Sequence, residues 1–123
     1  NLVKLSSILP PACRKVEPYA PEYGSLTPTA YASITSSLPG EVIAGAVAVA
    51  IPEDDSLPGV IMEYSARGAA ENAEAIVREM AAEAFRIRGR ELKEILSVSA
   101  EHQIENIGAV FAAVVLGYDP IDY

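Results

Sequence analysis

Residues 41–51 read EVIAGAVAVAI and lead directly into Pro52. A run of Val, Ile and Ala that stops at a proline is typical of a strand buried on both faces of a sheet. A polar turn containing Pro58 and Gly59 follows, and residues 60–65 then form a second apolar segment. We therefore expect two neighbouring strands, joined by this turn, at the centre of the fold.

A single long amphipathic helix is predicted over residues 69–88. Apolar residues recur there every three or four positions, which places them on one stripe of the helix. The stripe comprises Ala73, Ile76, Val77, Met80, Ala81, Ala84 and Phe85. Glu74 precedes Arg78 by four residues, a spacing that favours an ion pair. Gly89 is expected to end the helix, because glycine adopts the left-handed terminal conformation without steric strain.

Shorter strands are expected on both sides of these central elements. Weak alternation of apolar and polar residues, bounded by turn residues, predicts strands at residues 2–5, 29–35, 94–102 and 108–116. Several strands with one long helix indicate an α+β domain with antiparallel sheets. The strands are rich in alanine and bury little area per residue, which favours an oligomer.

The composition describes one globular domain with an acidic charge. The 123 residues include 9 Lys and Arg against 17 Asp and Glu, which gives a net charge of −8. No Lys- or Arg-rich segment is present, so we expect a cationic or neutral small partner and no nucleic acid. No apolar run approaches the roughly 20 residues of a membrane-spanning helix. The single cysteine, Cys13, excludes an internal disulfide and suits a reducing cytoplasm.

Glu63 is the strongest catalytic candidate that the pattern offers. In a strand at residues 60–65, alternation places Ile61 and Glu63 on one face and Met62 and Tyr64 on the other. If Ile61 faces the interior, Glu63 does too, and burial would favour the protonated form that a general acid needs. A Glu63 on a solvated face is equally compatible with the pattern.

His102 and Cys13 are weaker candidates. His102 is the single histidine, so a conventional catalytic triad would have to use it as its base, but a strand-end histidine beside Glu101 or Glu105 is the simpler interpretation. Cys13 has basic neighbours, yet it is better explained as a small structural thiol. These two residues cannot by themselves form a zinc site.

Seven short motifs follow one another along the chain. They are NLVKLSSILPP at 1–11, LTPTAY at 26–31, LPGE at 38–41, VAIP at 49–52, SLPGVIMEY at 56–64, VREMA at 77–81 and EH at 101–102. In this order they resemble the pyruvoyl-dependent arginine decarboxylases over nearly the whole sequence. The resemblance implies an antiparallel β-sandwich flanked by helices in αββα layers, assembled as a trimer of αβ units with active sites at the subunit interfaces.

The resemblance gives a role to the pair Ser6-Ser7, which on its own predicts only a turn at the end of a strand. In that family the precursor cleaves itself between two adjacent serines, and the second serine becomes a covalent pyruvoyl group. Residues 1–6 would then be the end of a β chain whose last residue is Ser6, and Ser7 would begin an α chain at residues 7–123. We expect residues 1–123 to form one domain and, since the chain does not begin with methionine, a further N-terminal segment in the precursor.

The implied reaction converts L-arginine to agmatine and carbon dioxide in polyamine biosynthesis. The pyruvoyl group formed from Ser7 makes a Schiff base with the substrate amine and accepts the electrons released as carbon dioxide leaves, so neither a metal nor pyridoxal phosphate is expected. Asn1 corresponds to the family's asparagine that assists processing, and Glu63 to its proton donor. The same chemistry on another amino acid, and an unprocessed trimeric binding protein of the same fold, are the alternatives.

Overall fold

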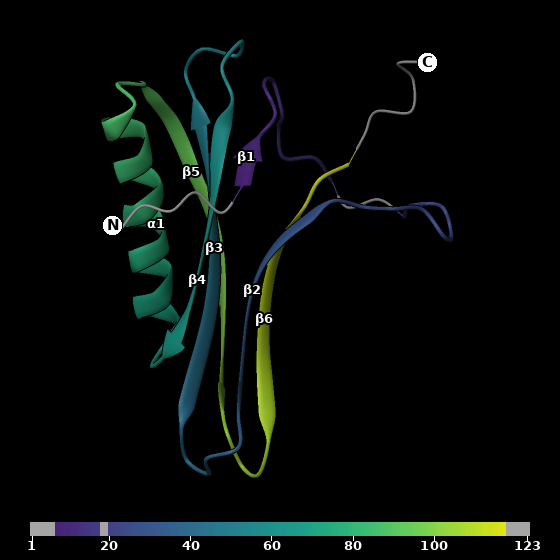
Figure 1. The fold of residues 1–123 in the computed structure, drawn as a ribbon, viewed down its shortest axis with the longest axis vertical. Helices are drawn as coiled ribbons and strands as arrows, with labels where there is room; N and C mark the ends of the chain where they lie inside the picture. The colour runs from purple at the N-terminus through teal and green to yellow at the C-terminus, as the bar shows by residue number, and fades with distance from the viewer. Residues whose placement is uncertain (1–6, 18–19, 118–123) are drawn as a thin grey trace.

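One helix and six strands make up the part of the chain that the computed structural model describes, residues 7–17 and 20–117. In chain order they are β1 (Ser7–Leu9), β2 (Thr29–Ser36), β3 (Val42–Pro52), β4 (Gly59–Arg67), α1 (Ala70–Ile87), β5 (Leu92–Gln103) and β6 (Gly108–Val115). A four-stranded antiparallel sheet has the strand order β1-β4-β3-β5, and β2 pairs with β6 in a second antiparallel sheet (Figure 1). The predicted α+β class with antiparallel sheets is therefore confirmed.

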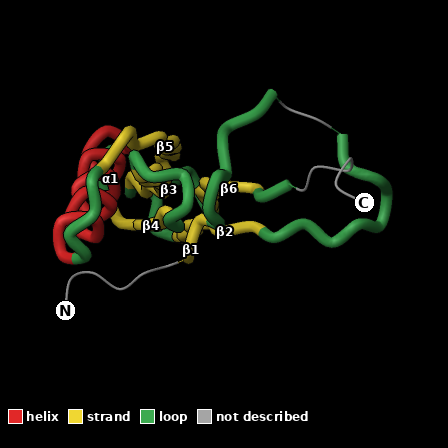
Figure 2. Tube along the Cα trace, turned by 90° about the horizontal axis from the view of Figure 1, so that it is seen from above, coloured by secondary structure: helices red, strands yellow, loops and turns green. Residues whose placement is uncertain are grey.

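The helix and the two-stranded sheet lie on opposite faces of the four-stranded sheet (Figures 1 and 2). On one face, Val77 and Phe85 of α1 pack against β3 and β4. On the other face, Val47 of β3 packs against Ala32 of β2 and Ala112 of β6. The described residues thus form three layers in the order helix, sheet, sheet, and they include no second helix outside the two-stranded sheet.

The central strand β3 is buried on both faces, as the sequence predicted. Its even-numbered alanines face α1, and its odd-numbered Ile and Val residues face the second sheet or β1. The alanines are Ala44, Ala46, Ala48 and Ala50. Because alanine has the smallest apolar side chain, the helix can lie close against the sheet along this row. The helix therefore covers one face of the strands that carry the candidate site.

The helix begins and ends within a residue of the predicted limits. Ala69 is the N-cap and provides no side-chain cap, but the carboxylate of Glu101 accepts a hydrogen bond from the Ala70 N–H at 3.0 Å. Gly89 follows the C-cap with a φ of 63°, in the left-handed region, as predicted. The packing stripe was wrong at Ile76, which is 41% exposed, because Ile76 lies about 100° around the helix from Val77, at the edge of the buried side. No helix among the described residues is long and apolar enough to cross a membrane.

A polar cluster joins the helix to β5. The carboxylate of Glu74 accepts hydrogen bonds from the hydroxyls of Ser97 and Ser99, both at 2.6 Å. The guanidinium of Arg78 donates to the Ser97 hydroxyl at 2.9 Å and to the Ile95 carbonyl at 3.1 Å. These serine hydrogen bonds lower the pKa of Glu74, and the charge of Arg78 lowers it further. Glu74 and Arg78 thus meet at one serine hydroxyl, where the sequence predicted a direct ion pair.

Candidate active site

Strand β1 places Ser7 at the edge of the four-stranded sheet, beside β4 (Figure 1). The register pairs Ser7 with Ile61, Ile8 with Val60 and Leu9 with Gly59. Leu9 is 4% exposed and belongs to one core cluster with Ile61, Val49 and Ile51. Backbone pairing and the buried Leu9 side chain together hold the described part of this strand, Ser7–Leu9, in place. The predicted strand at residues 2–5 lies outside the described residues.

Gly59 is required for the close approach of β1 to β4. A Cβ at this position would collide with the carbonyl oxygen of Ala50, and it would lie 3.0 Å from the Leu9 Cδ2 and 3.2 Å from the Leu9 Cβ. Because residue 59 has no side chain, Leu9 can pack directly over the start of β4. Gly59, predicted from the sequence as a turn residue, is therefore part of the surface against which β1 packs.

Glu63 lies two residues beyond Ile61 on β4. Ile61 is fully buried on the face away from the helix, whereas Met62 packs against α1. Alternation thus puts Glu63 on the inner face between the two sheets, as the sequence proposed under the condition that Ile61 is buried. Glu63 itself is half-buried, because it lies at the rim of that interior.

A hollow of about 530 Å³ opens beside Glu63, between the edges of β2 and β4. Its lining residues are Thr29, Ala30, Tyr31, Ala32 and Ser33 of β2 and Glu63, Tyr64 and Ser65 of β4. Within the described residues, β1 pairs with β4 only as far as Ile61, so the following part of that edge faces the hollow. A volume of this size is in the range of small-molecule sites in proteins.

The register brings the backbone of Ser7 close to that of Glu63. Ser7 lies opposite Ile61, and Glu63 is the next residue of β4 on the same face. Diagonal neighbours of this kind in an antiparallel pair are roughly 7–8 Å apart. Two of the predicted site residues, distant in sequence, are thus neighbours in the fold. The other two, Asn1 and Ser6, lie outside the described residues.

The structure does not bring His102 to this place within the chain. His102 pairs with Ile43 of β3, six residues along that strand from Val49, which pairs with Ile61. At about 3.4 Å per residue this separation is roughly 20 Å along the sheet. His102 is exposed and lies against Gly108, where an added Cβ would come within 2.7 Å of its Cδ2.

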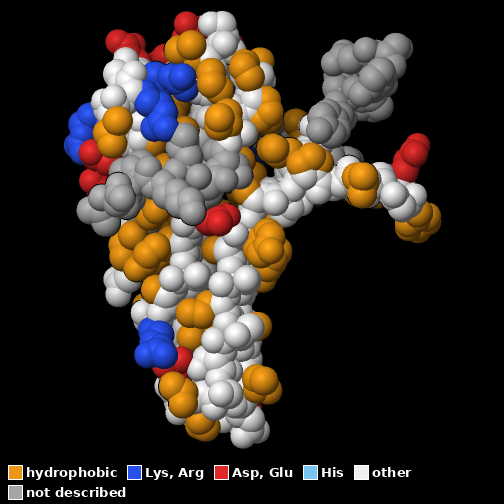
Figure 3. All heavy atoms as spheres, viewed as in Figure 1, with side chains coloured by type: hydrophobic (Ala, Val, Ile, Leu, Met, Phe, Trp, Pro, Cys, Tyr) orange, Lys and Arg blue, Asp and Glu red, His pale blue; other side chains and the backbone are white. Residues whose placement is uncertain are grey.

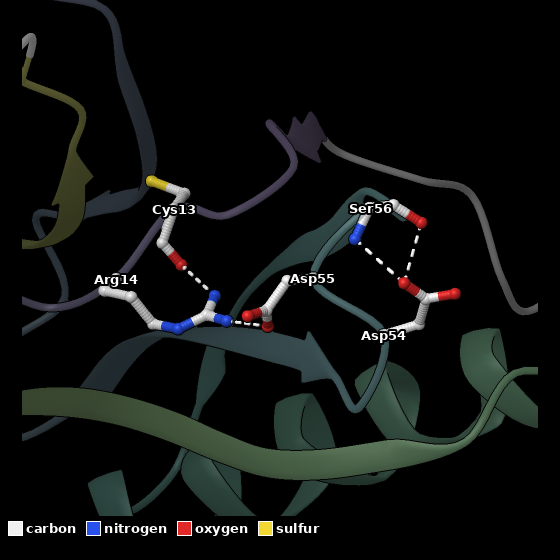
Figure 4. A network of polar contacts seen from close by, with 5 residues as sticks. All are labelled: Cys13, Arg14, Asp54, Asp55 and Ser56. Atoms are coloured by element: carbon white, nitrogen blue, oxygen red, sulfur yellow. Dashed lines mark hydrogen bonds and ion pairs between the residues drawn. The ribbon is translucent and has the colours of Figure 1, made fainter.

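Cys13 and Arg14 lie in the segment that follows β1. Cys13 is a free, half-buried thiol that packs against the cluster containing Leu9, which agrees with the structural interpretation. Arg14 donates from Nη1 to the Cys13 carbonyl at 2.8 Å and forms an ion pair through Nη2 with Asp55 (Figure 4). Within residues 7–17 and 20–117, no three His, Cys, Asp or Glu side chains are grouped as metal ligands.

Sequence reasoning missed Gly59 and Asp55 as parts of this region. Pro58-Gly59 is an ordinary turn signal, and Asp55 belongs to an acidic turn that reads as solvated surface. Both residues matter because they contact residues far earlier in the chain. Gly59 pairs with Leu9, and Asp55 binds Arg14. For Gly59 the sequence held one hint, since residues 56–64 belong to the motifs shared with the family, whereas Asp55 lies outside them.

The fold is shared with a pyruvoyl enzyme. The solved structure of pyruvoyl-dependent histidine decarboxylase at pH 8 superposes with a TM-score of 0.64 and 18% sequence identity, over 83% of this chain and 55% of that chain. At this identity the likeness concerns the fold alone. The architecture is thus of the α+β class that this histidine decarboxylase also has.

Sequence comparison identifies the family. The family model for pyruvoyl-dependent arginine decarboxylase matches residues 1–119. The pyruvoyl-dependent arginine decarboxylase of Methanococcus aeolicus is 50% identical over 118 residues, and that of Methanocaldococcus jannaschii is 48% identical over 118 residues. Each match covers 96% of this chain and 72% of the relative. The chain belongs to the pyruvoyl-dependent arginine decarboxylase family, which confirms the resemblance found in its motifs.

Proposed function

We propose that this protein cleaves itself between Ser6 and Ser7 and then decarboxylates L-arginine to agmatine and carbon dioxide. The observation that carries the proposal is the register of β1 on β4, which sets Ser7 opposite Ile61 and near Glu63, beside a hollow of about 530 Å³. Family membership supports arginine as the substrate. The net charge of −8 favours the approach of a cationic molecule.

Processing begins with attack of the Ser7 hydroxyl on the carbonyl carbon of Ser6, which converts the amide into an ester. Elimination then removes the α-proton of Ser7, breaks the bond between Cβ and oxygen of Ser7, and releases the β chain with a carboxylate at Ser6. Hydrolysis of the remaining dehydroalanine leaves the pyruvoyl group and releases ammonia. The side-chain amide of Asn1 assists by donating a hydrogen bond to the oxyanion that forms in the first step.

The described residues fit a reactive group at the start of β1. The backbone that follows Ser7 is held by its pairing with β4 and by the buried Leu9 side chain. Gly59 allows Leu9 to lie directly against the start of β4. The pyruvoyl group supplies a carbonyl that binds the substrate amine and accepts the electrons released with carbon dioxide. Glu63 holds the proton that is delivered to the α-carbon, and its half-buried position limits the access of water to that proton.

The proposed assembly is a trimer of αβ units with active sites between subunits. Support comes from an apolar groove of about 1080 Å³, which is lined by residues of β3, β5 and β6 and of the segment between β1 and β2. Figure 1 shows how β6 runs beside β3 and β5 and then leaves the four-stranded sheet. The groove is lined in part by Val98 of β5 and Val115 of β6, which are 50% and 59% exposed. Contiguous exposed apolar surface of this kind commonly marks an interface between proteins.

A second helical layer would complete the αββα sandwich over the outer face of β2 and β6. Tyr31 and Phe111 stack on that face with ring centroids 5.2 Å apart, and they are 51% and 60% exposed. Figure 3 shows hydrophobic side chains at the surface along much of the molecule, including the part over β2.

A cytoplasmic location is supported by the free thiol of Cys13, the single cysteine of the chain.

The substrate is tested by product analysis. The full-length protein is incubated in turn with L-arginine, L-lysine, L-ornithine and L-histidine, and the amines formed are identified by chromatography and mass spectrometry. Agmatine from arginine, formed much faster than any amine from the other three, supports the proposal. A preference for another amino acid would overturn the substrate, and formation of no amine by the cleaved protein would overturn the activity.

A further inference from the structure

We infer that Arg14 and Asp55 are positioning residues for self-cleavage, because their ion pair ties the segment that follows β1 to the turn that leads into β4. The inference rests on the proposed function. The ion pair thus links the chain just after the strand that carries Ser7 to the chain just before the strand that carries Glu63.

The chain turns sharply directly after β1. The N–H of Cys13 donates to the carbonyl of Pro10 at 3.3 Å, and Ala12 within this turn has a φ of 63°. An alanine in the left-handed region is strained and persists only where its surroundings hold it. The half-buried Cys13 side chain is one such contact, since it packs against the cluster that contains Leu9.

The guanidinium of Arg14 is the second contact that holds this turn. One of its nitrogens donates to the Cys13 carbonyl at 2.8 Å, and the other forms the ion pair with Asp55. A single side chain thus binds both the backbone after β1 and the turn between β3 and β4 (Figure 4). The planar guanidinium suits this role, because its donors are fixed relative to one another.

Asp55 is presented by a turn that is itself well ordered by hydrogen bonds. The carboxylate of Asp54 accepts from the Ser56 hydroxyl at 2.7 Å and from the Ser56 N–H at 2.9 Å, and these bonds lower the pKa of Asp54. The carbonyl of Asp54 also accepts from the Leu57 N–H at 3.1 Å. The ion pair therefore anchors the segment after β1 to a fixed point, four residues before Gly59.

The expected effect is local. The side chains of Arg14 and Asp55 are 34% and 66% exposed, and ion pairs with such exposure add little to global stability. Within the described residues, β1 has three paired residues, and the contacts that follow it add to the hold on its position. Loss of the pair should leave the fold intact and loosen the strand that carries the cleavage site.

The test uses the full-length protein and its variants Arg14→Gln, Asp55→Asn and the double variant, with Arg86→Gln as the matched control. Arg86 also forms an exposed ion pair, with Glu83 on the helix. The cleaved fraction is followed over time on denaturing gels, from the uncleaved precursor made by cell-free synthesis. Hydrogen exchange of residues 7–17 and the thermal midpoint are measured on the same samples.

We expect each single variant to cleave about two- to fivefold more slowly than the wild type. The double variant should be no slower than the single ones, because both substitutions break one interaction. Exchange should rise in residues 7–17, with thermal midpoints like that of Arg86→Gln. The inference would be overturned if Asp55→Asn cleaved at the wild-type rate and showed wild-type hydrogen exchange. It would also be overturned if the double variant cleaved more slowly than either single variant, by the product of their two effects. A wild-type chain that never cleaves would instead overturn the proposed function, and unchanged exchange in Asp55→Asn would still overturn the role of the ion pair.

Discussion

Ser7 and Ile61 face each other across the edge of the four-stranded sheet, although 53 residues separate them in the chain. This pairing puts the first residue of β1 next to the half of β4 that carries Glu63. The nucleophile that we propose for chain cleavage and the acid that we propose for the later reaction thereby lie on two hydrogen-bonded strands. The chemistry that we propose depends on this relationship, and the predictions below probe its parts separately.

Replacing Ser7 with alanine should abolish both chain cleavage and release of carbon dioxide. Alanine has no oxygen that could attack the preceding carbonyl or leave in the elimination. Cleavage is read from denaturing mass spectrometry and turnover from labelled carbon dioxide. Ser25→Ala, at an exposed loop position, serves as the control and should behave as the wild type. Cleavage in the Ser7→Ala variant would rule out Ser7 as the nucleophile.

Replacing Glu63 with glutamine should separate the two reactions. The variant should still cleave, at least in part, because its strand and hollow are retained. Its decarboxylation rate should fall by about 10²- to 10⁴-fold, since glutamine cannot donate the proton. Glu71→Gln, on the exposed side of α1, is the control for the loss of one carboxylate. Normal turnover in Glu63→Gln would remove this residue from the mechanism.

The Gly59→Ala substitution tests the close packing of β1 against the start of β4. The added methyl group would collide with the Ala50 carbonyl and crowd Leu9, so we expect a loss of about 1–3 kcal/mol in the free energy of unfolding and slower cleavage. Gly45→Ala is the matched control, because a Cβ there would have no neighbour closer than 3.4 Å. Urea unfolding and cleavage time courses give both quantities. Equal stability and cleavage in the two variants would contradict the close packing of β1.

The Glu74 cluster predicts a specific pH dependence of stability. Hydrogen bonds from Ser97 and Ser99 lower the pKa of Glu74 below its ordinary value of 4.5. The contribution of this carboxylate is therefore complete above about pH 4.5 and is lost as the pH falls through the lowered pKa. Wild type should be more stable than Glu74→Gln at pH 7, and the difference should shrink below pH 4.5. A difference that stays constant from pH 7 to pH 3 would contradict this role.

The helix and strands that were predicted correctly are those marked by apolar periodicity and turn residues within one short segment of the sequence. The buried strand around Val47 and the helix that ends before Gly89 follow from periodicity and turn residues over short stretches. The pattern left the face of Glu63 open, because it did not show whether Ile61 is buried. The prediction that Ile76 is buried was wrong, because a three- or four-residue spacing defines a stripe on the helix but not the edges of its buried side.

The contacts of β1 could not be derived in the same way. Its pairing with Ile61 and the ion pair between Arg14 and Asp55 join residues more than forty positions apart. Neither contact leaves a periodic or compositional pattern in the sequence. For the ion pair, any exposed Arg could have paired with any exposed Asp. The role of Ser7 likewise came from the family resemblance and not from its neighbours in the chain.

The most direct test of the central claim is the intact mass of the full-length protein after prolonged incubation, measured with and without a hydrazine reagent. The account predicts two pieces that divide between Ser6 and Ser7, with the longer piece lighter than its serine form and labelled by the reagent at its new keto end. A single unbroken chain that takes up no hydrazine would contradict it.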